Sequence, residues 1–376
     1  MSTKPKIALV HHWLVSPGGA EKVLLELHHM YPEAPIYTTA YIPAKFPEFA
    51  QADIRTSFLN RIPLLRYKHQ LFPAFLGTPF KLFDMDDYDI VISSCAAEAK
   101  YVRTKSHTLH ICYCHTPVRY YWTDYQWRLQ NMPFGRLNGL ARLVFPLLVG
   151  RLRAIDYEAA RQVDVFVANS RHIQARIKQY YHRDSTVIYP PIATEELLKL
   201  TRAPQDYYLI VGRQVASKRL DVAVAAFNEL GLTLKVCGQG EEIARQKPLA
   251  RPNVEFLGRV SDWERDALMA GAKAFIFPPE EDFGIVPLEA MAAGCPVIAY
   301  GSGGAPEYVI DGQTGVLFAE QTAESLIDGV RRFEKMAFDE AVIRAKAREF
   351  DTSVFVKTMG AFVEAQWDGF TGKRPQ

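Results

Sequence analysis

Two glutamates separated by seven residues, Glu281 and Glu289, flank a stretch of the chain that could bind a sugar phosphate. Between them, Gly284 lets the backbone approach a ligand closely. The backbone N–H groups of Gly284, Ile285 and Val286 would point out of the start of the following helix, where a phosphate binds well. Carboxylates beside an anion are unfavourable unless they accept hydrogen bonds from hydroxyl groups, as a sugar provides. The stretch therefore indicates a sugar phosphate, and a solvated acidic loop is the alternative.

A second loop places two cations, Arg213 and Lys218, five residues apart after a predicted strand. A guanidinium fork and an ammonium point charge converge naturally on a diphosphate. They would stabilise the negative charge of such a diphosphate. By itself the loop is equally well a solvated basic loop. Together with the acidic stretch, it favours diphosphate binding.

A third candidate, His115, lies in the first half of the chain. We expect it at the carboxyl end of a parallel strand, where ligands bind in sheets of this kind. The segment that follows holds Arg119, Tyr120, Tyr121 and Trp122, which could line an acceptor sugar, with the aromatic rings covering its apolar face. A packed or capping histidine is the alternative.

A glycine pair, Gly18 and Gly19, lies between a predicted strand at 6–14 and a predicted helix at 20–30. A strand, a glycine loop and a helix form the phosphate-binding unit of many nucleotide-binding domains. By itself, the glycine pair fits a simple turn at least as well as a phosphate-binding loop.

Short apolar segments alternate with helical patterns throughout, which predicts an α/β protein with doubly wound parallel sheets. The pattern starts again near 190, so we expect two Rossmann-like domains, 1–190 and 191–350, facing a cleft. The predicted strands lie at 6–14, 87–94, 110–115, 163–169, 186–189, 207–211, 232–237, 254–257 and 274–277. Beyond Gly315 we expect only helices. The pair Gly238 and Gly240 lacks the third glycine of a dinucleotide site, and no phosphate loop of the ATP-binding type occurs.

The composition is that of an ordinary globular protein, with 48% hydrophobic and 23% charged residues. A net charge of +2 is too small to favour nucleic acid. Five scattered cysteines predict no disulfide framework and a reducing compartment. Cys112 and Cys114 precede His115 without the second ligand pair that a structural zinc needs. With no expected signal peptide, and an apolar run at 143–150 far short of the ~20 residues that span a bilayer, we expect a cytoplasmic protein.

Two stretches without Asp or Glu, 54–83 and 125–155, combine basic with apolar and aromatic residues. Such a composition suits an element that lies on anionic lipid. An ordinary core or inter-domain helix with basic flanks is the alternative. We expect a protein peripheral to the inner face of the cytoplasmic membrane.

Three motifs resemble those of retaining glycosyltransferases of the GT-B fold, the family 4 class that includes glycogen synthase, sucrose synthase and bacterial mannosyltransferases. The first is Glu-x7-Glu around Phe-Gly-Ile-Val-Pro-Leu, followed by Ala-Met-Ala-Ala-Gly-Cys-Pro. The second, Val-Gly-Arg-x4-Lys-Arg-x-Asp, is similar to the diphosphate loop of the class. The third, His-Thr-Pro-x-Arg-Tyr-x-Trp, looks like a motif of bacterial mannosyltransferases that build surface polysaccharides.

The resemblance implies a role for each candidate residue. It places Gly18, Gly19, Arg213 and Lys218 at the diphosphate, His115 at the transferred sugar, Glu281 at its hydroxyls, Glu289 at the ribose, Arg259 and Val260 at the base, and Phe283, Gly284, Ile285 and Val286 at the donor. It also implies that the C-terminal part, 351–376, forms a helix returning to the acceptor-binding first domain. The donor phosphate would take the acceptor proton with retention of configuration and without a bound metal. Asp84 and Asp86 resemble a metal motif but read as a polar turn.

We therefore expect mannose transfer from GDP-mannose to a lipid-linked oligosaccharide in the biosynthesis of a bacterial surface polysaccharide (O-antigen, capsule or exopolysaccharide). A UDP-sugar donor is the nearest alternative. A non-catalytic nucleotide-sugar or glycan-binding subunit and a nucleotide-sugar epimerase are alternatives of other classes. The joint presence of Arg213, Lys218, Glu281 and Glu289 argues against a subunit that has lost its activity.

Overall fold

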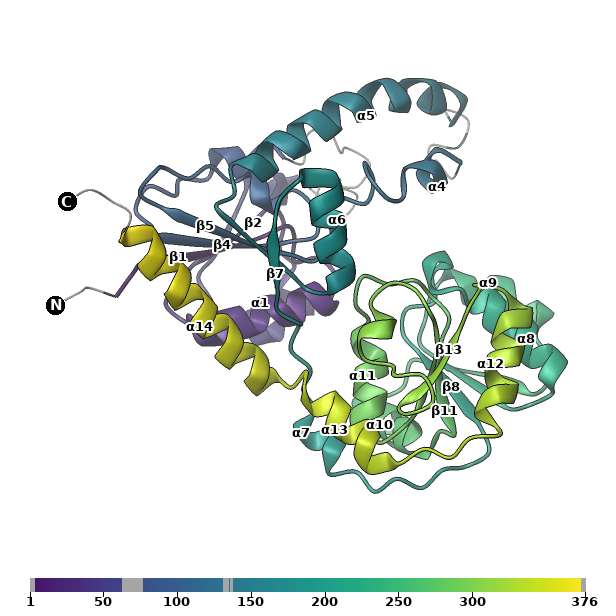
Figure 1. Cartoon of the computed structure of the whole chain (residues 1–376). Coiled ribbons are helices and arrows are strands. Elements are labelled where there is room, and N and C mark those ends of the chain that lie inside the picture. The colour runs from purple at the N-terminus through teal and green to yellow at the C-terminus, as the bar shows by residue number, and fades with distance from the viewer. Residues whose placement is uncertain (1–3, 63–76, 131–134, 136–137, 373–376) are drawn as a thin grey trace. The chain divides into compact units, whose positions relative to one another are not determined.

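The computed structural model describes residues 4–62, 77–130, 135 and 138–372. The chain divides into two compact units (Figure 1). The first takes in Met1–Tyr189 and Val356–Gln376, and the second takes in Pro190–Phe355. Most of the C-terminal helix α14 (Thr352–Thr371) therefore belongs to the first unit.

The first unit is built on a seven-stranded parallel sheet in the order β3-β2-β1-β4-β5-β6-β7. Its strands are β1 (Ile7–His11), β2 (Ile36–Thr38), β3 (Ile54–Thr56), β4 (Ile90–Cys95), β5 (Leu109–Cys114), β6 (Val165–Ala168) and β7 (Ser185–Val187). Its other helices are α1 (Gly19–Met30), α4 (Tyr125–Gln130), α5 (Asn138–Arg161) and α6 (Arg171–Tyr181), with 3-10 turns at Pro43–Lys45, Pro47–Phe49, Phe58–Arg61, Pro79–Leu82 and Ala99–Tyr101. The two central strands β4 and β5 are buried along their whole length, as parallel strands covered on both faces must be.

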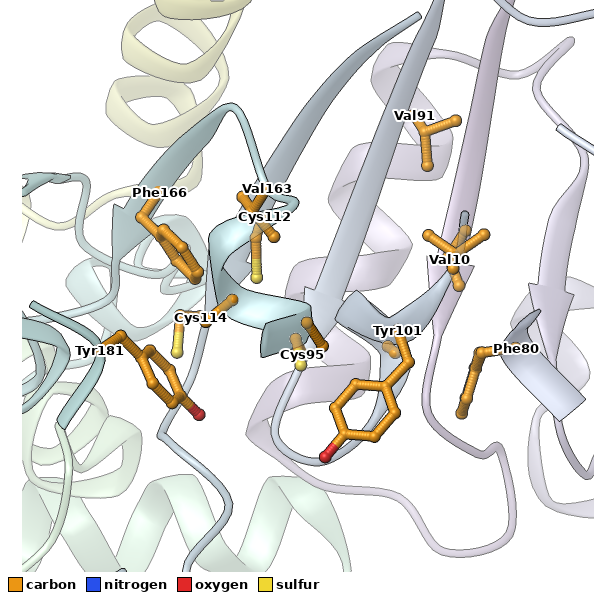
Figure 2. Close-up of a cluster of buried hydrophobic side chains, with 14 of the residues drawn as sticks. Val10, Phe80, Val91, Cys95, Tyr101, Cys112, Cys114, Val163, Phe166 and Tyr181 are labelled. Carbon is orange, nitrogen blue, oxygen red and sulfur yellow. The ribbon is translucent and has the colours of Figure 1, made fainter. Parts of the chain in front are cut away.

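One face of this sheet carries the apolar core shown in Figure 2. Alternate residues of β4 and β5 point to it because side chains alternate between the two faces of a strand. Cys95, Cys112 and Cys114 lie together here as buried free thiols, beside Tyr101 and Tyr181. These cysteines therefore act as small apolar side chains in the core.

The second unit has a six-stranded parallel sheet in the order β10-β9-β8-β11-β12-β13. Its strands are β8 (Tyr208–Val211), β9 (Leu234–Cys237), β10 (Val254–Gly258), β11 (Ala274–Phe277), β12 (Val297–Tyr300) and β13 (Gly315–Phe318). Its helices are α7 (Glu195–Leu198), α8 (Leu220–Leu230), α9 (Glu241–Gln246), α10 (Asp262–Gly271), α11 (Ile285–Ala292), α12 (Ala323–Phe333) and α13 (Glu340–Arg348), with 3-10 turns at Ala216–Lys218, Lys247–Leu249 and Ala305–Glu307.

The prediction of two α/β halves with parallel sheets is confirmed, and several of its elements are corrected. The first strand ends at His11, not at residue 14. The expectation of helices alone after Gly315 was wrong, because β13 begins there and pairs with β12. The three-residue strands β2 and β3 were missed, since a run this short leaves no periodic signal.

The chain order reverses at the centre of both sheets. In the first unit β1 lies beside β4, and in the second β8 lies beside β11. The loops that follow two such strands lead to opposite faces of the sheet, which opens a crevice at their carboxyl ends. Each unit therefore has one position where its topology favours a ligand.

Candidate functional site

In the second unit, the loops after β8 and β11 bring Lys218 and Glu281 together. Lys218 ends the 3-10 turn Ala216–Lys218, and Glu281 follows β11. Because β8 and β11 are hydrogen-bonded neighbours, their loops leave the same edge of the sheet. The Lys218 ammonium forms an ion pair with the Glu281 carboxylate, and about a third or less of each side chain is exposed. Arg213 lies in the same loop as Lys218 and is exposed.

Glycines hold the loop of Arg213 against its neighbour. A Cβ on Gly238 would lie 1.9 Å from the carbonyl oxygen of Gly212, and one on Gly240 would lie 2.0 Å from that of Gln214. The Gln214 amide donates to the carbonyls of Gly212 and Cys237, at 3.0 and 3.1 Å. The two glycines after β9 thus permit a close backbone contact, a role that their sequence pattern did not reveal.

Helix α11 begins directly after Gly284, whose φ of 91° lies in a region that other residues avoid. A Cβ here would lie 2.7 Å from the Tyr308 hydroxyl and 2.9 Å from Phe277. Ile285 and Val286 form the first turn, as predicted, with Pro287 in the third position. The start of α11, where the first N–H groups have no acceptor within the helix itself, therefore directly follows the loop of Glu281 at the switch point.

The loop after β12 supports the backbone of Glu281, a contact that the sequence analysis missed. The Gly304 N–H donates to the Glu281 carbonyl at 2.8 Å. A Cβ on Gly303 would lie 2.4 Å from the same oxygen. Replacement of either glycine would displace the main chain that carries the carboxylate.

Glu289 is buried on α11 and lies near Arg265 of α10. Burial lowers the pKa of Arg265, but the charges of Glu289 and Asp266 more than offset this effect and raise it. Phe283 is 3% exposed and packs against Tyr308 and Phe350, so its ring belongs to the core. Any donor contact of Phe283 would come from its main chain.

Arg259 and Val260 follow β10 at the carboxyl edge of the same sheet. The Gly238 N–H donates to the carbonyl of Gly258 at 2.7 Å, which ties this loop to the loop after β9. Arg259 is exposed and Val260 is half-buried. The loops after β8, β9, β10 and β11 thus share one edge of the second sheet.

In the first unit, His115 joins a buried polar cluster at the other switch point. Its Nε2 lies 2.9 Å from Ser94 Oγ, which lies 3.1 Å from Nδ1 of His11. The Nε2 atom of His11 is 3.5 Å from the Glu21 carboxylate, in the first turn of α1. Burial, and then the charges of His11 and His12, lower the pKa of His115, and burial lowers the pKa of His11 to about 3. Both rings are therefore neutral at pH 7.

Gly18 and Gly19 lie at the start of helix α1, two to three residues before Glu21 of this cluster. Gly18 is the N-cap residue and Gly19 the first helical residue, and both are exposed. A Cβ on Gly18 would lie 3.0 Å from an oxygen of Glu21. The start of α1 therefore has exposed glycines at its first positions and a buried carboxylate, Glu21, in its first turn.

The predicted acceptor residues lie after β5. Arg119 and Tyr120 are half-buried. The Trp122 indole N–H donates to the buried Asp156 at 2.8 Å, and the ring stacks on Tyr180 with centroids 5.0 Å apart. Asp156 is 0% exposed and also accepts from Lys100, Tyr101 and Tyr181. Trp122 therefore helps to anchor α5 and α6 to the sheet, a structural role that the motif did not predict.

Helix α5 exposes apolar side chains beside arginines in the predicted membrane segment 125–155. Leu143 is 70% and Leu147 is 77% exposed, with Val144 and Leu148 beside them. Arg142 and Arg151 are exposed on the same helix. Figure 1 shows the start of α5 and the short α4 extending beyond the sheet of this unit. Among the described residues, no helix combines the length and the hydropathy needed to span a bilayer.

Parts of both predicted membrane segments, at 63–76, 131–134 and 136–137, lie outside the described residues. In the segment 54–83 the described part consists of β3 and two 3-10 turns. Leu82 and Phe58 are exposed there.

Two protein families match successive parts of the chain. Residues 17–196 match the family described as Glycosyltransferase Family 4, and residues 198–350 match Glycosyl transferases group 1. The two matches meet beside the division between the two units. Together they include Ser94 and His115 of the first switch point and the whole of the second, but not β1.

Curated relatives match parts of the chain. A glycogen synthase of Mycobacterium tuberculosis is 36% identical over 152 residues, which is 37% of this chain and 36% of that protein. An uncharacterized glycosyltransferase of Methanocaldococcus jannaschii is 28% identical over 173 residues, 45% of this chain and 49% of its own. The alpha-1,3/1,6-mannosyltransferase alg2 of Schizosaccharomyces pombe is 50% identical over 66 residues, 17% of this chain and 13% of its own. The chain thus spans half or less of the length of these relatives.

Solved structures match nearly the whole chain in fold. HepE of Anabaena, in complex with UDP, superimposes with a TM-score of 0.70 at 18% identity, covering 96% of this chain and 100% of its own. A sucrose-phosphate synthase of Thermosynechococcus elongatus superimposes with a TM-score of 0.71 at 17% identity, covering 97% of this chain and 100% of its own. At this identity the likeness establishes the architecture of two parallel-sheet domains.

Proposed function

Because this chain belongs to the glycosyltransferases of the family 4 and group 1 type and has the GT-B fold, we propose that it is a retaining hexosyltransferase that uses a nucleotide sugar. The observation that carries the proposal is the ion pair of Lys218 and Glu281 at the switch point of the second sheet. It puts a cation for a phosphate and a carboxylate for sugar hydroxyls at one place. The second unit is accordingly the donor-binding domain and the first the acceptor-binding domain.

In this proposal the bound donor separates the ion pair: its diphosphate replaces Glu281 as the partner of Lys218, and its sugar hydroxyls replace Lys218 as the partners of Glu281. Lys218 and the exposed Arg213 bind the diphosphate, and Glu281 accepts hydrogen bonds from the hydroxyls of the donor sugar. The N–H groups of Gly284, Ile285 and Val286 add positive partial charge from the start of α11. The cations stabilise the leaving diphosphate as the sugar–oxygen bond breaks, so we assign no metal to this step.

The remaining residues hold the rest of the donor and the acceptor. Glu289 binds the ribose, and the loop of Arg259 and Val260 lies against the base. Gly18 and Gly19 offer a second helix start to the diphosphate, and His115 meets the transferred sugar. Arg119 and Tyr120 line the acceptor, with Trp122 holding their segment. A donor phosphate oxygen takes the proton of the acceptor hydroxyl on the face that the diphosphate leaves, which retains the configuration.

For the donor we propose GDP-mannose. The support is the segment from His115 to Trp122 and the 66-residue stretch that is half identical to a protein named as a mannosyltransferase. A UDP-sugar is the second candidate, because HepE, a protein of the same fold, is solved with UDP and with UDP-glucose. A non-catalytic binding subunit and an epimerase are the alternatives of other classes.

For the acceptor we propose a lipid-linked oligosaccharide of a bacterial surface polysaccharide at the inner face of the cytoplasmic membrane. The exposed leucines and arginines of α5 support this proposal. Apolar side chains enter the acyl boundary while arginines bind anionic head groups. The protein would therefore be peripheral to the membrane.

A thermal-shift panel of GDP, UDP, ADP and TDP tests the donor assignment. A nucleotide at 100 times its dissociation constant stabilises the protein by roughly 2.7 kcal/mol. We expect a shift with GDP that is clearly smaller in Lys218→Ala. A shift with UDP alone would replace GDP-mannose by a UDP-sugar, and no shift with any nucleotide would overturn the transferase. Rapid turnover of the nucleotide sugar without an acceptor would identify an epimerase.

A further inference from the structure

A chain of buried polar groups links Glu21 to His115 in the first unit, through one ion-pair contact of 3.5 Å between Glu21 and His11 and two hydrogen bonds through Ser94. His11 is the last residue of β1, and Ser94 is its register partner on β4. Ser94 Oγ lies between the two histidine rings, 3.1 Å from His11 Nδ1 and 2.9 Å from His115 Nε2. His11 is 0% and Glu21 8% exposed, so water reaches this chain poorly.

The charge of the Glu21 carboxylate favours one direction for the two hydrogen bonds of this chain. A neutral imidazole has one N–H and one lone pair, and a hydroxyl has one proton to donate. Nε2 of His11 forms no hydrogen bond in the structure, but it faces the Glu21 carboxylate at 3.5 Å, and this negative charge favours the tautomer of His11 that carries the proton on Nε2. His11 Nδ1 then accepts from the Ser94 hydroxyl, and Ser94 Oγ in turn accepts from His115.

We propose that Glu21, acting through His11 and Ser94, fixes the tautomer of His115 in which Nε2 carries the proton. Nδ1 of His115 is then the lone-pair nitrogen and accepts a hydrogen bond from a hydroxyl group. This inference deepens the proposed function, since there His115 meets a hydroxyl-rich sugar. Glu21, His11 and Ser94 are positioning residues, because they act on the ligand only through His115.

A bound cation would give the opposite tautomer. Ligand atoms of His11, His12 and Glu21 lie within 4.8 Å of one another, near enough to share a metal ion. Such an ion would take the lone pair of His11 Nε2, and His11 Nδ1 would then donate to Ser94. Ser94 would donate to His115 Nε2, and His115 would carry its proton on Nδ1. The tautomer of His115 therefore distinguishes the two arrangements.

The same two strands provide a matched control. Ser93 lies on the opposite face of β4, and its Oγ is 2.9 Å from Nε2 of His110 on β5. Both residues are 0% exposed. Ser93→Ala therefore removes a buried hydroxyl from a histidine, as Ser94→Ala does, without touching His11 or His115.

Two-bond ¹H–¹⁵N spectra of the histidine-labelled full-length protein test the proposal, with His115 assigned by His115→Gln. We expect the Nε2–H tautomer in the wild type and a mixture of tautomers in Ser94→Ala. Glu21→Gln, whose amide can donate as well as accept, should also give a mixture. Ser93→Ala should leave the His115 signals unchanged.

An Nδ1–H tautomer in the wild type overturns the proposal, as does a His115 spectrum that neither Glu21→Gln nor Ser94→Ala alters. One equivalent of zinc in the purified protein, with the His11 nitrogens shifted by the metal, overturns it also. These spectra need no donor or acceptor. A clear tautomer result in a protein without transferase activity would therefore refute the proposed function and leave the positioning chain intact. In an active enzyme, Glu21→Gln should lower kcat more than it raises KM.

Discussion

Lys218 and Glu281 lie 63 residues apart in the sequence and form an ion pair at the carboxyl edge of two adjacent strands. Without a ligand, each of the two groups neutralises the charge of the other. In the proposed function, the pair would hold the cation for the phosphate and the carboxylate for the sugar in place before the donor binds. Such preorganisation reduces the entropy lost when a ligand binds.

Glu281→Gln is expected to strengthen the binding of a nucleoside diphosphate while it abolishes sugar transfer. The change frees Lys218 and removes a negative charge near the diphosphate. Because both groups are partly exposed, the gain should not exceed about 1 kcal/mol. Lys218→Ala should weaken the same binding by about 1.5–3 kcal/mol, the value of a hydrogen bond to a charged group. Calorimetry with GDP and UDP measures both effects.

The control for this pair is Lys273→Ala, which removes a similarly exposed lysine from its ion pair with Glu334 in the same unit. It should leave nucleotide affinity unchanged. Equal affinity of the wild type and Glu281→Gln would show that the ion pair does not compete with the diphosphate.

Gly284→Ala is expected to destabilise the second unit by at least about 2 kcal/mol, because the backbone conformation is strained for alanine and the new Cβ meets Tyr308 and Phe277. Gly231→Ala is the matched control. Gly231 has a φ of 71° at the end of α8, but nothing lies within 4 Å of its added Cβ. That variant should lose only about 1 kcal/mol. Urea unfolding curves measure the free energy of unfolding of both variants. Equal decreases would show that the contacts with Tyr308 and Phe277 add nothing to the destabilisation.

Glu98 is expected to make the first unit less stable as the pH rises from 5 to 8. Its side chain is 1% exposed, and burial raises its pKa from an ordinary 4.5 to about 7. The folded state therefore holds a proton that the unfolded chain has already lost. This stabilisation is complete below pH 4.5 and is lost as the pH passes through 7, by about 2–3 kcal/mol between pH 5 and pH 8.

Glu98→Gln keeps the hydrogen bonding with Tyr121 possible and removes the charge. Its unfolding free energy should vary less with pH than that of the wild type and exceed it at pH 8. Glu33→Gln, an exposed position in the same unit, should retain the wild-type dependence. A Glu98→Gln profile parallel to that of the wild type would place the titration elsewhere.

Leu143→Glu combined with Leu147→Glu is expected to abolish binding to anionic vesicles. Both side chains are at least 70% exposed on α5 and would leave the acyl boundary once charged. Flotation with anionic and neutral vesicles measures binding, and the nucleotide thermal shift should remain. Leu249→Glu, at a leucine 66% exposed in the second unit, is the control. Failure of the wild type to float with either vesicle would end the membrane proposal.

The fold class and the residues of the loops after β8 and β11 could be predicted from the residue pattern alone. Alternating apolar and helical segments predicted two parallel-sheet domains, because buried parallel strands are apolar throughout. The types and spacing of Arg213, Lys218, Glu281 and Glu289 indicated a phosphate and a sugar, since each loop follows one strand and can be read locally. The short strands β2, β3, β12 and β13 were not predicted, because runs of three or four residues leave no periodic signal, even where the residues favour a strand as in Val-Ile-Ala-Tyr of β12.

Which distant side chains meet could not be predicted from the sequence and follows from the tertiary fold. The order of the strands places β8 beside β11 and β1 beside β4, and no local pattern specifies that order. The ion pair of Lys218 with Glu281, and the chain from Glu21 through Ser94 to His115, depend on it. Packing likewise made Trp122 an anchor for Asp156, a role visible only once the helices cover the sheet. The sequence thus specified the chemical groups, and the topology of the two sheets brought them together.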